Sequence, residues 1–358
     1  MLFRSIEISN IRGTTDETVK TMRETLNNLS NDKEATNEDW LVDSTEKFCQ
    51  EKAIYNAITE SLEIMNGKGK VTKGAIPGLL SDALAISFDP NVGHDYFEQA
   101  DERYEHYHRV EERLSFDLEF FNKITKNGIP KKTLNIVMGG VGGGKSLTLC
   151  HLTAGYLTQG KNVLYISLEL SEEELSKRID ANLMNITMDD LMVLPKDLYD
   201  KKIASIRQKT EGKLIIKEFA TATASTIHFR SLLNELNLKK GFVPDVIMVD
   251  YLNICASSRI KPGNGVNSYT YVKAIAEELR GLAVEFNVPI WSATQLTRSG
   301  YTSTDPGMED TSESFGLPAT ADFFFAIVVT EQLTQLGQIM VKQLKNRYNR
   351  SEEHTSEL

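Results

Sequence analysis

The stretch that most constrains this chain is "GGVGGGKS", residues 139–146, because it dictates both a backbone geometry and its surroundings. The apolar run "LNIVM" lies directly before it, and the helix-favouring run "LTLCHLTAGYL" follows it. A glycine-rich turn between a strand and a helix, ending in Lys-Ser, matches the GxxxxGK[ST] pattern of phosphate-binding loops. Its backbone N–H groups can turn inward around phosphate oxygens, and the helix N-terminus adds its dipole. The motif therefore predicts a nucleotide-binding P-loop domain.

Every position of this loop is predicted to help hold the nucleotide. Lys145 is expected to reach the β- and γ-phosphates, and the Ser146 hydroxyl to hold Mg²⁺. A glycine-rich turn with a surface lysine is the alternative, and the complete motif between strand and helix argues against it. The predicted nucleotide-binding residues are Gly139, Gly140, Val141, Gly142, Gly143, Gly144, Lys145, Ser146 and Leu147.

From about residue 115 onward, short β-rich runs alternate with helical runs. The run "NVLYISL" precedes "SEEELSKRIDANLM", and "DVIMVD" precedes "SYTYVKAIAEELRGLAVEF". This rhythm predicts an α/β fold with a mainly parallel, twisted sheet covered on both faces. The last two runs, "FFFAIVV" and "QIMVKQL", are joined by a segment too short for a crossover helix. We therefore expect them to form a hairpin at one edge of the sheet.

The residues before the α/β core show helical spacing in place of the alternation of strands and helices. Residues 15–66 are polar with apolar residues at helical spacing, which predicts amphipathic helices, and we assign residues 6–66 to a partial all-α N-terminal region. The Gly/Lys-rich stretch "NGKGKVTKGAIPG" is the best linker candidate. A short helix in "LLSDALAISF" and a charged helix in "YFEQADERYEHYHRVEERL" follow it. We accordingly assign residues 67–114 to a linker with helices and residues 115–349 to the α/β core.

Both ends of the chain read as translated sequencing adapter. The last nine residues, "RSEEHTSEL", are what AGATCGGAAGAGCACACGTCTGAACTC encodes, and the opening "MLFRS" is encoded by GTGCTCTTCCGATCT with GTG as the start. Terminal scars of this kind are set aside before fold reasoning. We expect residues 1–5 and 350–358 to be foreign and the natural sequence to be cut at both ends.

Three polar side chains are expected at the strand ends beside the P-loop, where open α/β sheets place ligands. Asp250 ends "DVIMVD" and is predicted to hold Mg²⁺ together with Ser146; the alternative is a helix N-cap or a turn aspartate. Glu169 ends "LYISLE" and is predicted to orient or deprotonate the attacking water; the alternative is membership of the acidic helix turn at 172–174. Gln295 ends "PIWSATQ", where an amide could sense the γ-phosphate.

Composition narrows the classes of partner. The net charge is -10, which argues against a protein coated in positive charge for nucleic acid but not against a strand held in a local channel. The three cysteines are far apart and form no CxxC pair, so reduced thiols in a cytosol-like compartment are expected. No apolar run approaches the roughly 18 residues of a membrane span, so no membrane partner is expected.

Taken together, these motifs resemble the RecA-like core of the DnaB class of hexameric replicative helicases. "SLELSEEELSKR", "VDYLNI" and "TQLTRS" are similar to that family's glutamate, second nucleotide and glutamine motifs. Four further stretches are similar to the T-even bacteriophage branch of the class: "GAIPGLLSDALAISFDPNVGHD", "NSYTYVKAIAEELRGLAVE", "ESFGLPATADF" and "KNRY". The resemblance implies a ring driven by ATP, or alternatively GTP, with Mg²⁺, that moves along single-stranded DNA and opens the replication fork.

The resemblance also implies roles for individual residues. Arg178 stands at the family's spacing after Glu169 and is expected in the nucleotide site. Lys345 and Arg347 lie two residues apart on a late strand, where the family projects two cations into the neighbouring subunit's site. An arginine finger of this kind can increase the rate roughly 10³- to 10⁵-fold. The alternative is an edge strand protected by charges.

The resemblance further implies a homohexameric ring that works with a primase and a helicase loader in the cytoplasm of an infected bacterial cell. DNA contacts are expected in the loops "ASSRIKPGNGVNS", with Arg259 and Lys261, and "SGYTSTDPGMEDTSESFG". In the second loop Ser312 stands before Glu313, where many DnaB-type proteins have an arginine.

Two other functions remain open. A RecA-type recombinase or another RecA-fold DNA-dependent ATPase would share the P-loop, a similarly placed glutamate and Asp250. A loader that binds nucleotide only as a switch would not need Glu169.

Overall fold

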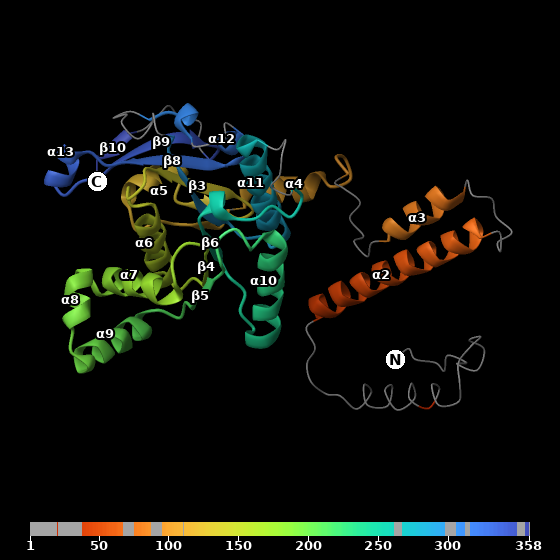
Figure 1. The fold of residues 1–358 in the computed structure, drawn as a ribbon, viewed down its shortest axis with the longest axis horizontal. Coiled ribbons are helices and arrows are strands. Elements are labelled where there is room, and N and C mark those ends of the chain that lie inside the picture. The colour runs from red at the N-terminus through yellow and green to blue at the C-terminus, as the bar shows by residue number, and fades with distance from the viewer. Residues whose placement is uncertain are drawn as a thin grey trace. The chain divides into compact units, whose positions relative to one another are not determined.

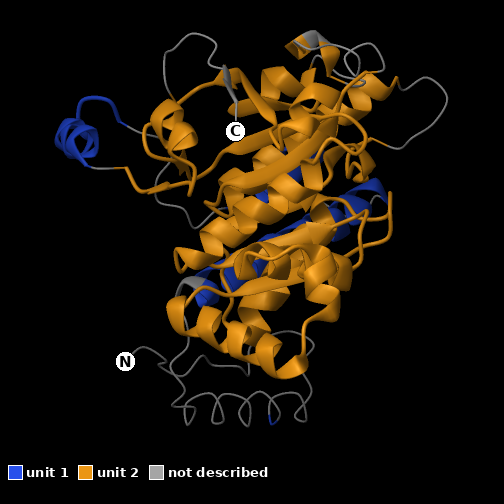
Figure 2. Cartoon of the chain, turned by 90° about the vertical axis from the view of Figure 1, so that its left-hand side faces the viewer, with its two compact units in different colours: residues 1–109 blue, residues 110–358 orange. Residues whose placement is uncertain are grey.

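A computed structural model describes residue 20 and residues 38–66, 75–86, 95–109, 111–260, 267–297, 306–311, 316–348 and 355–357. The chain divides into two compact units, residues 1–109 and 110–358 (Figure 2). The nucleotide-site candidates all belong to the second unit.

The described part of the first unit is helical. It contains α2 (Glu38–Met65), α3 (Ile76–Leu84) and α4 (Ala100–His108). α2 and α3 pack together, with Ala57, Ile64 and Ala83 buried. One expectation was wrong: the charged helix predicted over residues 96–114 ends at His108. Arg109 takes an extended backbone conformation, and Arg113–Leu114 form a strand of the second unit instead.

The second unit is built on an eight-stranded sheet (Figure 1). β1 (Arg113–Leu114) and β2 (Ile129–Pro130) form a separate antiparallel pair. The main sheet has the order β10 (Thr355–Glu357), β9 (Met340–Asn346), β8 (Phe323–Val328), β3 (Leu134–Gly139), β7 (Ile290–Gln295), β6 (Val246–Asp250), β4 (Val163–Ser167) and β5 (Leu214–Glu218). All pairs from β8 to β5 are parallel, as the alternating pattern predicted.

Helices cover both faces of this sheet (Figure 1). α5 (Glu119–Thr125), α6 (Lys145–Thr158) and α7 (Glu172–Met184) bury their apolar side chains on one face. α10 (Thr226–Lys240), α11 (Ser268–Glu285) and α12 (Gly316–Thr320) cover the other face. Successive strand residues alternate between the two cores, so Ile136 faces α11 and Val137 faces α6. The remaining helical segments are α8 (Met188–Val193), α9 (Lys196–Lys209), α13 (Glu331–Gln335), η3 (Leu252–Ile254) and η5 (Met308–Asp310).

The predicted terminal hairpin is present. β8 and β9 are antiparallel, with α13 in the connection and a bulge at Phe324/Phe325. The short strand β10 pairs with the outer side of β9, so one further strand lies outside the hairpin. The register sets which end of β9 lies where. Val341 is level with Ile327 and Gly139, whereas Asn346 is level with Phe323 and Asn135.

Candidate nucleotide-binding site

The P-loop joins the end of β3 to the start of α6. Gly144 is the N-cap of α6 and has a φ of 84°, a left-handed conformation that a larger side chain would strain. A Cβ atom on Gly143 would lie 3.0 Å from the Gly140 nitrogen. These two glycines allow the loop to close tightly enough for its N–H groups to converge on one ligand.

Lys145 lies inside the loop that it is predicted to serve. It is 9% exposed, and its Nζ donates to the carbonyl oxygens of Gly139 at 3.3 Å and Gly140 at 2.8 Å. Burial lowers the pKa of Lys145, and the carboxylates of Glu169 and Asp250 partly oppose that shift. The ammonium is thus held against the loop backbone by two carbonyl oxygens.

Lys145→Ala is expected to weaken nucleotide binding roughly tenfold to hundredfold, because a hydrogen bond to a charged group contributes about 1.5–3 kcal/mol. Titration of the protein with a fluorescent ATP analogue measures the change. Lys131→Ala is the matched control, because Lys131 pairs with Glu112 at the surface. Equal affinity in the two variants would remove Lys145 from the phosphate site.

Asp250 is the last residue of β6 and is 1% exposed. Its Oδ1 accepts from the Ser146 hydroxyl at 3.3 Å, and its Oδ2 accepts from the Tyr165 hydroxyl at 2.9 Å. Burial raises the pKa of Asp250, while the hydrogen bonds from Tyr165 and Ser146 lower it. The N-cap alternative is wrong, because η3 has Tyr251 as its N-cap.

The oxygen atoms of Ser146 and Asp250 suit Mg²⁺, a hard cation that takes one or two protein oxygens and completes its shell with water and phosphate. The described residues contain no cluster of three or more His, Cys, Asp or Glu side chains able to hold a metal by themselves.

A cavity of about 290 Å³ brings most of the predicted residues together, and we call it the P-loop cavity. Glu169 follows β4 and precedes Ser171, the N-cap of α7, so it lies outside the acidic first turn of that helix. Gln295 ends β7 level with Gly139, and its Nε2 donates to the Tyr251 hydroxyl at 2.9 Å. The cavity is lined by Val141, Gly142, Gly143, Gly144, Lys145, Ser146, Leu147, Glu169, Leu170, Arg178, Met188 and Gln295.

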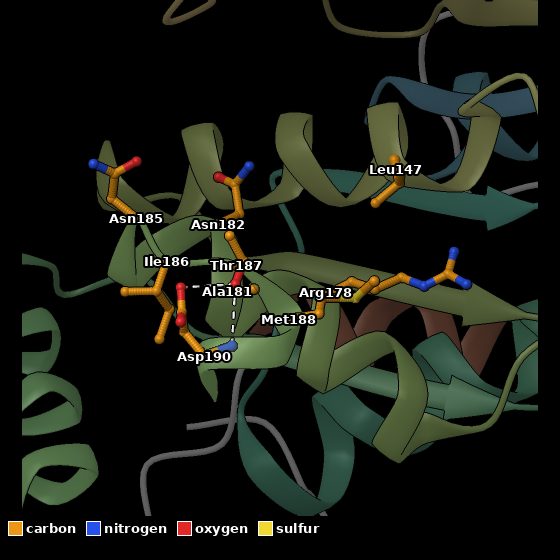
Figure 3. A pocket seen from close by; sticks show the side chains of 9 residues that line it. All are labelled: Leu147, Arg178, Ala181, Asn182, Asn185, Ile186, Thr187, Met188 and Asp190. Atoms are coloured by element: carbon orange, nitrogen blue, oxygen red, sulfur yellow. Dashed lines mark hydrogen bonds between the residues drawn. The ribbon is translucent and has the colours of Figure 1, made fainter. Parts of the chain in front are cut away.

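Arg178 lines both the P-loop cavity and a second cavity of about 530 Å³ between α7 and α8. Figure 3 shows its side chain pointing away from Asn185, toward the end of the second cavity where Leu147 lies. Its Nε is a buried nitrogen without a hydrogen-bond partner, and no other such side-chain atom occurs among the described residues. Burying an unpaired donor is costly, so this nitrogen is available to a ligand oxygen.

Lys345 and Arg347 lie elsewhere. Lys345 Nζ donates to the carbonyls of Pro318 at 2.7 Å and Ala319 at 2.9 Å. Arg347 donates through Nη2 to Ala319 at 3.1 Å and through Nη1 to Asp322 Oδ1 at 2.8 Å. Both side chains donate to the Ala319 carbonyl, so they reach the same place in the fold. They lie at the edge of the sheet where β3 and β8 begin, which we call the far rim, opposite the P-loop.

The structure adds residues that the sequence did not suggest. Tyr165 and Tyr251 hold Asp250 and Gln295 through their hydroxyls. The signal for them is weak, since a buried tyrosine needs a hydrogen-bond partner but the sequence does not say which. Met188 and Leu170 also line the P-loop cavity.

Of the candidate DNA-contact cations, the structure describes Arg259. Arg259 pairs with Glu277 at 2.8 Å and Glu278 at 3.5 Å, so its guanidinium already has protein partners. Lys261, Ser312 and Glu313 lie outside the described residues. Within the described part of the chain, every helix is too short or too polar to span a bilayer.

Comparison with known proteins identifies the family. The sequence profile described as "DnaB-like helicase C terminal domain" matches residues 114–352. The "DnaB-like replicative helicase" of Enterobacteria phage T4 is 47% identical over 321 residues, which cover 86% of this chain and 67% of that protein. The "Probable plasmid replicative DNA helicase" of Chlamydia trachomatis is 32% identical over 40% of this chain and 30% of that protein. The "Replicative DNA helicase DnaB" of Helicobacter pylori is 25% identical over 55% of this chain and 40% of that protein.

Two solved structures share the fold. "The Structure Of A DnaB-Like Replicative Helicase And Its Interactions With Primase" superposes with a TM-score of 0.61 at 16% identity, over 88% of this chain and 75% of that one. A second solved structure, an isolated ATPase domain, superposes with a TM-score of 0.60 at 17% identity, over 74% of this chain and 95% of that one. The predicted RecA-like core is therefore confirmed. By its helicase domain and its phage relative, the chain belongs to the family of DnaB-like replicative DNA helicases, which are NTP-hydrolysing enzymes.

Proposed function

We propose that this chain is the motor part of a homohexameric ring that hydrolyses ATP, or alternatively GTP, with Mg²⁺ to move along single-stranded DNA. In this proposal the ring opens duplex at a replication fork, in the 5′-to-3′ direction that the family resemblance implies. The observation that carries the proposal is the position of Lys345 and Arg347 at the far rim of the sheet.

The strand register separates these cations from the chain's own P-loop. Gly139 ends β3 beside the cavity, and Asn135 is level with Asn346 at the far rim. At about 3.3 Å per residue, the two levels are roughly 13 Å apart. This distance supports a contact of the two cations with phosphates of another subunit, and a head-to-tail contact of that kind closes into a ring when its rotation permits.

Within the P-loop cavity, the side chains divide the chemistry of hydrolysis. The loop N–H groups and Lys145 would bind the phosphates, and Ser146 with Asp250 would hold the magnesium ion, which supplies charge neutralisation when bound. Glu169 is exposed in the same cavity and would position the attacking water and accept its proton. Arg178 would donate its unpaired Nε to a nucleotide oxygen. Gln295 would contact the γ-phosphate, and its movement would shift the segment that follows β7.

The proposed partners are single-stranded and forked DNA, further copies of this chain, a primase and a helicase loader. A solved relative is titled for its interactions with primase, which supports that partner. The proposed location is the cytoplasm of an infected bacterial cell.

A single experiment tests the proposal. ATP hydrolysis by the purified chain is measured with and without oligo(dT), and strand separation is measured on a forked duplex. Stimulation by the single strand together with ATP-dependent unwinding is the expected result. Hydrolysis without unwinding, on filaments seen by electron microscopy, would favour the recombinase alternative instead.

The position of Lys345 gives a pH dependence. Burial, reinforced by the charges of Arg347 and Arg280, lowers the pKa of Lys345 to about 8, although Asp322 partly opposes the shift. A lysine is charged below its pKa, so the proposed phosphate contact is present below pH 8 and is lost as the pH rises. We expect kcat/KM to fall roughly fivefold from pH 8 to pH 9.

Lys345→Arg is the matched variant, because an arginine stays charged over this range. Its kcat/KM should stay level where that of the wild type falls. The same fall in both proteins would exclude Lys345 as the titrating group.

A further inference from the structure

Two cations at the far rim, Arg280 and Arg347, share one buried carboxylate. The Asp322 side chain is 5% exposed, and its Oδ1 accepts from Arg347 Nη1 at 2.8 Å and from Arg280 Nη2 at 3.1 Å. Its Oδ2 accepts from Arg280 Nε and from the Leu134 backbone N–H. Arg280 therefore donates to Asp322 through two nitrogens, and Arg347 donates to one oxygen of the same carboxylate.

This geometry fixes Arg347 without using up its donors. A guanidinium has five N–H groups in a rigid fork. Asp322 and the Ala319 carbonyl engage Nη1 and Nη2, and the side chain stays 47% exposed. Arg280, Ala319 and Arg347 line a surface cavity of about 470 Å³, into which the remaining donors can project.

Arg280 belongs to α11, and the same turn of α11 holds the segment that follows β6. The Glu278 side chain is 6% exposed and accepts from Thr226, from the Ser257 hydroxyl and from the Ser258 backbone N–H at 2.9 Å. Its neighbour Glu277 pairs with Arg259 at 2.8 Å. One turn of α11 therefore contains Glu277 and Glu278, which bind residues 257–259, and also Arg280, which binds Asp322.

We propose that Arg280 is a positioning residue that acts through Asp322 to orient Arg347, and that α11 thereby ties the segment after β6 to the far-rim cations. The proposal rests on the function proposed above, in which Arg347 serves a neighbouring subunit. A helix is a stiff element, so a shift of residues 257–259 by a bound strand would move Arg280 with it. DNA binding would then change hydrolysis in the adjacent subunit through side chains that contact neither ligand.

Arg280→Gln tests the positioning step. Loss of the bidentate grip should lower kcat roughly tenfold to hundredfold, the size of effect expected when a reacting group is misplaced by about 1 Å. The KM for ATP should stay unchanged, because Arg280 lies at the far rim of its own subunit. Arg280→Lys keeps the positive charge but not the forked guanidinium, so its kcat should lie between those of the wild type and Arg280→Gln.

The matched control is Arg230→Gln, which removes another two-nitrogen contact with a carboxylate of α11, Glu285. Equal effects of Arg230→Gln and Arg280→Gln on kcat would overturn the proposal, as would a wild-type kcat for Arg280→Gln. Thermal unfolding of both variants separates loss of fold from loss of position.

Glu278→Gln tests the link to DNA. It should reduce the stimulation of ATP hydrolysis by oligo(dT) and leave the DNA-free rate unchanged. Undiminished stimulation would overturn the link through α11.

Arg347→Ala, measured beside these variants, distinguishes failure of the proposed trans function from failure of the inference about Arg280 and α11. If Arg347→Ala hydrolyses ATP normally, the proposed trans function itself fails; if only the Arg280 and Glu278 variants behave normally, the inference alone fails.

Discussion

Glu169→Gln is expected to bind ATP with wild-type affinity and to hydrolyse it roughly 10²- to 10⁴-fold more slowly, the usual contribution of a positioned acid or base. The amide keeps the size of the side chain but cannot accept the proton of the attacking water. Glu169 lies in the P-loop cavity with Lys145 and Ser146 but contributes no backbone N–H to the loop, so binding and hydrolysis should separate. Equilibrium titration with a fluorescent analogue and single-turnover hydrolysis measure the two steps.

Glu173→Gln provides the control, because Glu173 lies in the first turn of α7 and does not line the P-loop cavity. Its turnover should match that of the wild type. Near-normal turnover in Glu169→Gln would exclude the water-positioning role. That result would instead favour a loader that uses nucleotide binding as a switch.

Arg347→Ala is expected to lower hydrolysis roughly 10³- to 10⁵-fold when every subunit carries it. The more telling experiment mixes it with Glu169→Gln in equal amounts, since each protein alone is inactive. Where an Arg347→Ala subunit receives the arginine of a Glu169→Gln neighbour, the site at their interface has every group again. Random assembly should restore about a quarter of the wild-type rate, because half of the P-loops and half of the donated arginines are intact.

A second mixture controls for exchange between subunits. Glu169→Gln and Lys145→Ala damage the same P-loop cavity, so no interface in their mixture has a complete site, and hydrolysis should not rise above the average of the two proteins alone. Recovery there, or no recovery in the first mixture, would contradict the assignment of Arg347 to a neighbouring site.

The sequence was sufficient for the fold and for much of the cavity, because those features follow from local patterns. The alternation of strands and helices predicted the parallel sheet, and the strand ends placed Asp250, Glu169 and Gln295 beside the P-loop. In a parallel sheet the carboxyl ends of all strands lie at the same edge. Residues at those ends can therefore be predicted to lie close together even when they are far apart in the sequence.

What escaped the sequence depends on contacts between distant residues. Nothing local predicts that Asp322 accepts from both Arg280 and Arg347, which lie 42 and 25 residues from it. The charged pattern of residues 96–114 favoured one continuous helix, but α4 ends at His108, and Arg113–Leu114 pair with Ile129–Pro130 as a strand. The resemblance predicted a role for Arg178, and the structure adds an observation that the sequence could not provide, namely that its Nε is buried without a hydrogen-bond partner.

The separation of the P-loop and the far-rim cations also bears on how such a ring could admit a strand of DNA. In the ring that we propose, each subunit would offer one half of a reaction centre on each side, so any open arc would have an unmatched half at both of its ends. In the ring that we propose, the gap through which a strand enters is therefore the one interface that cannot hydrolyse nucleotide. Admission of a strand and hydrolysis would exclude each other at that seam, and closure of the ring around the strand would complete its last reaction centre.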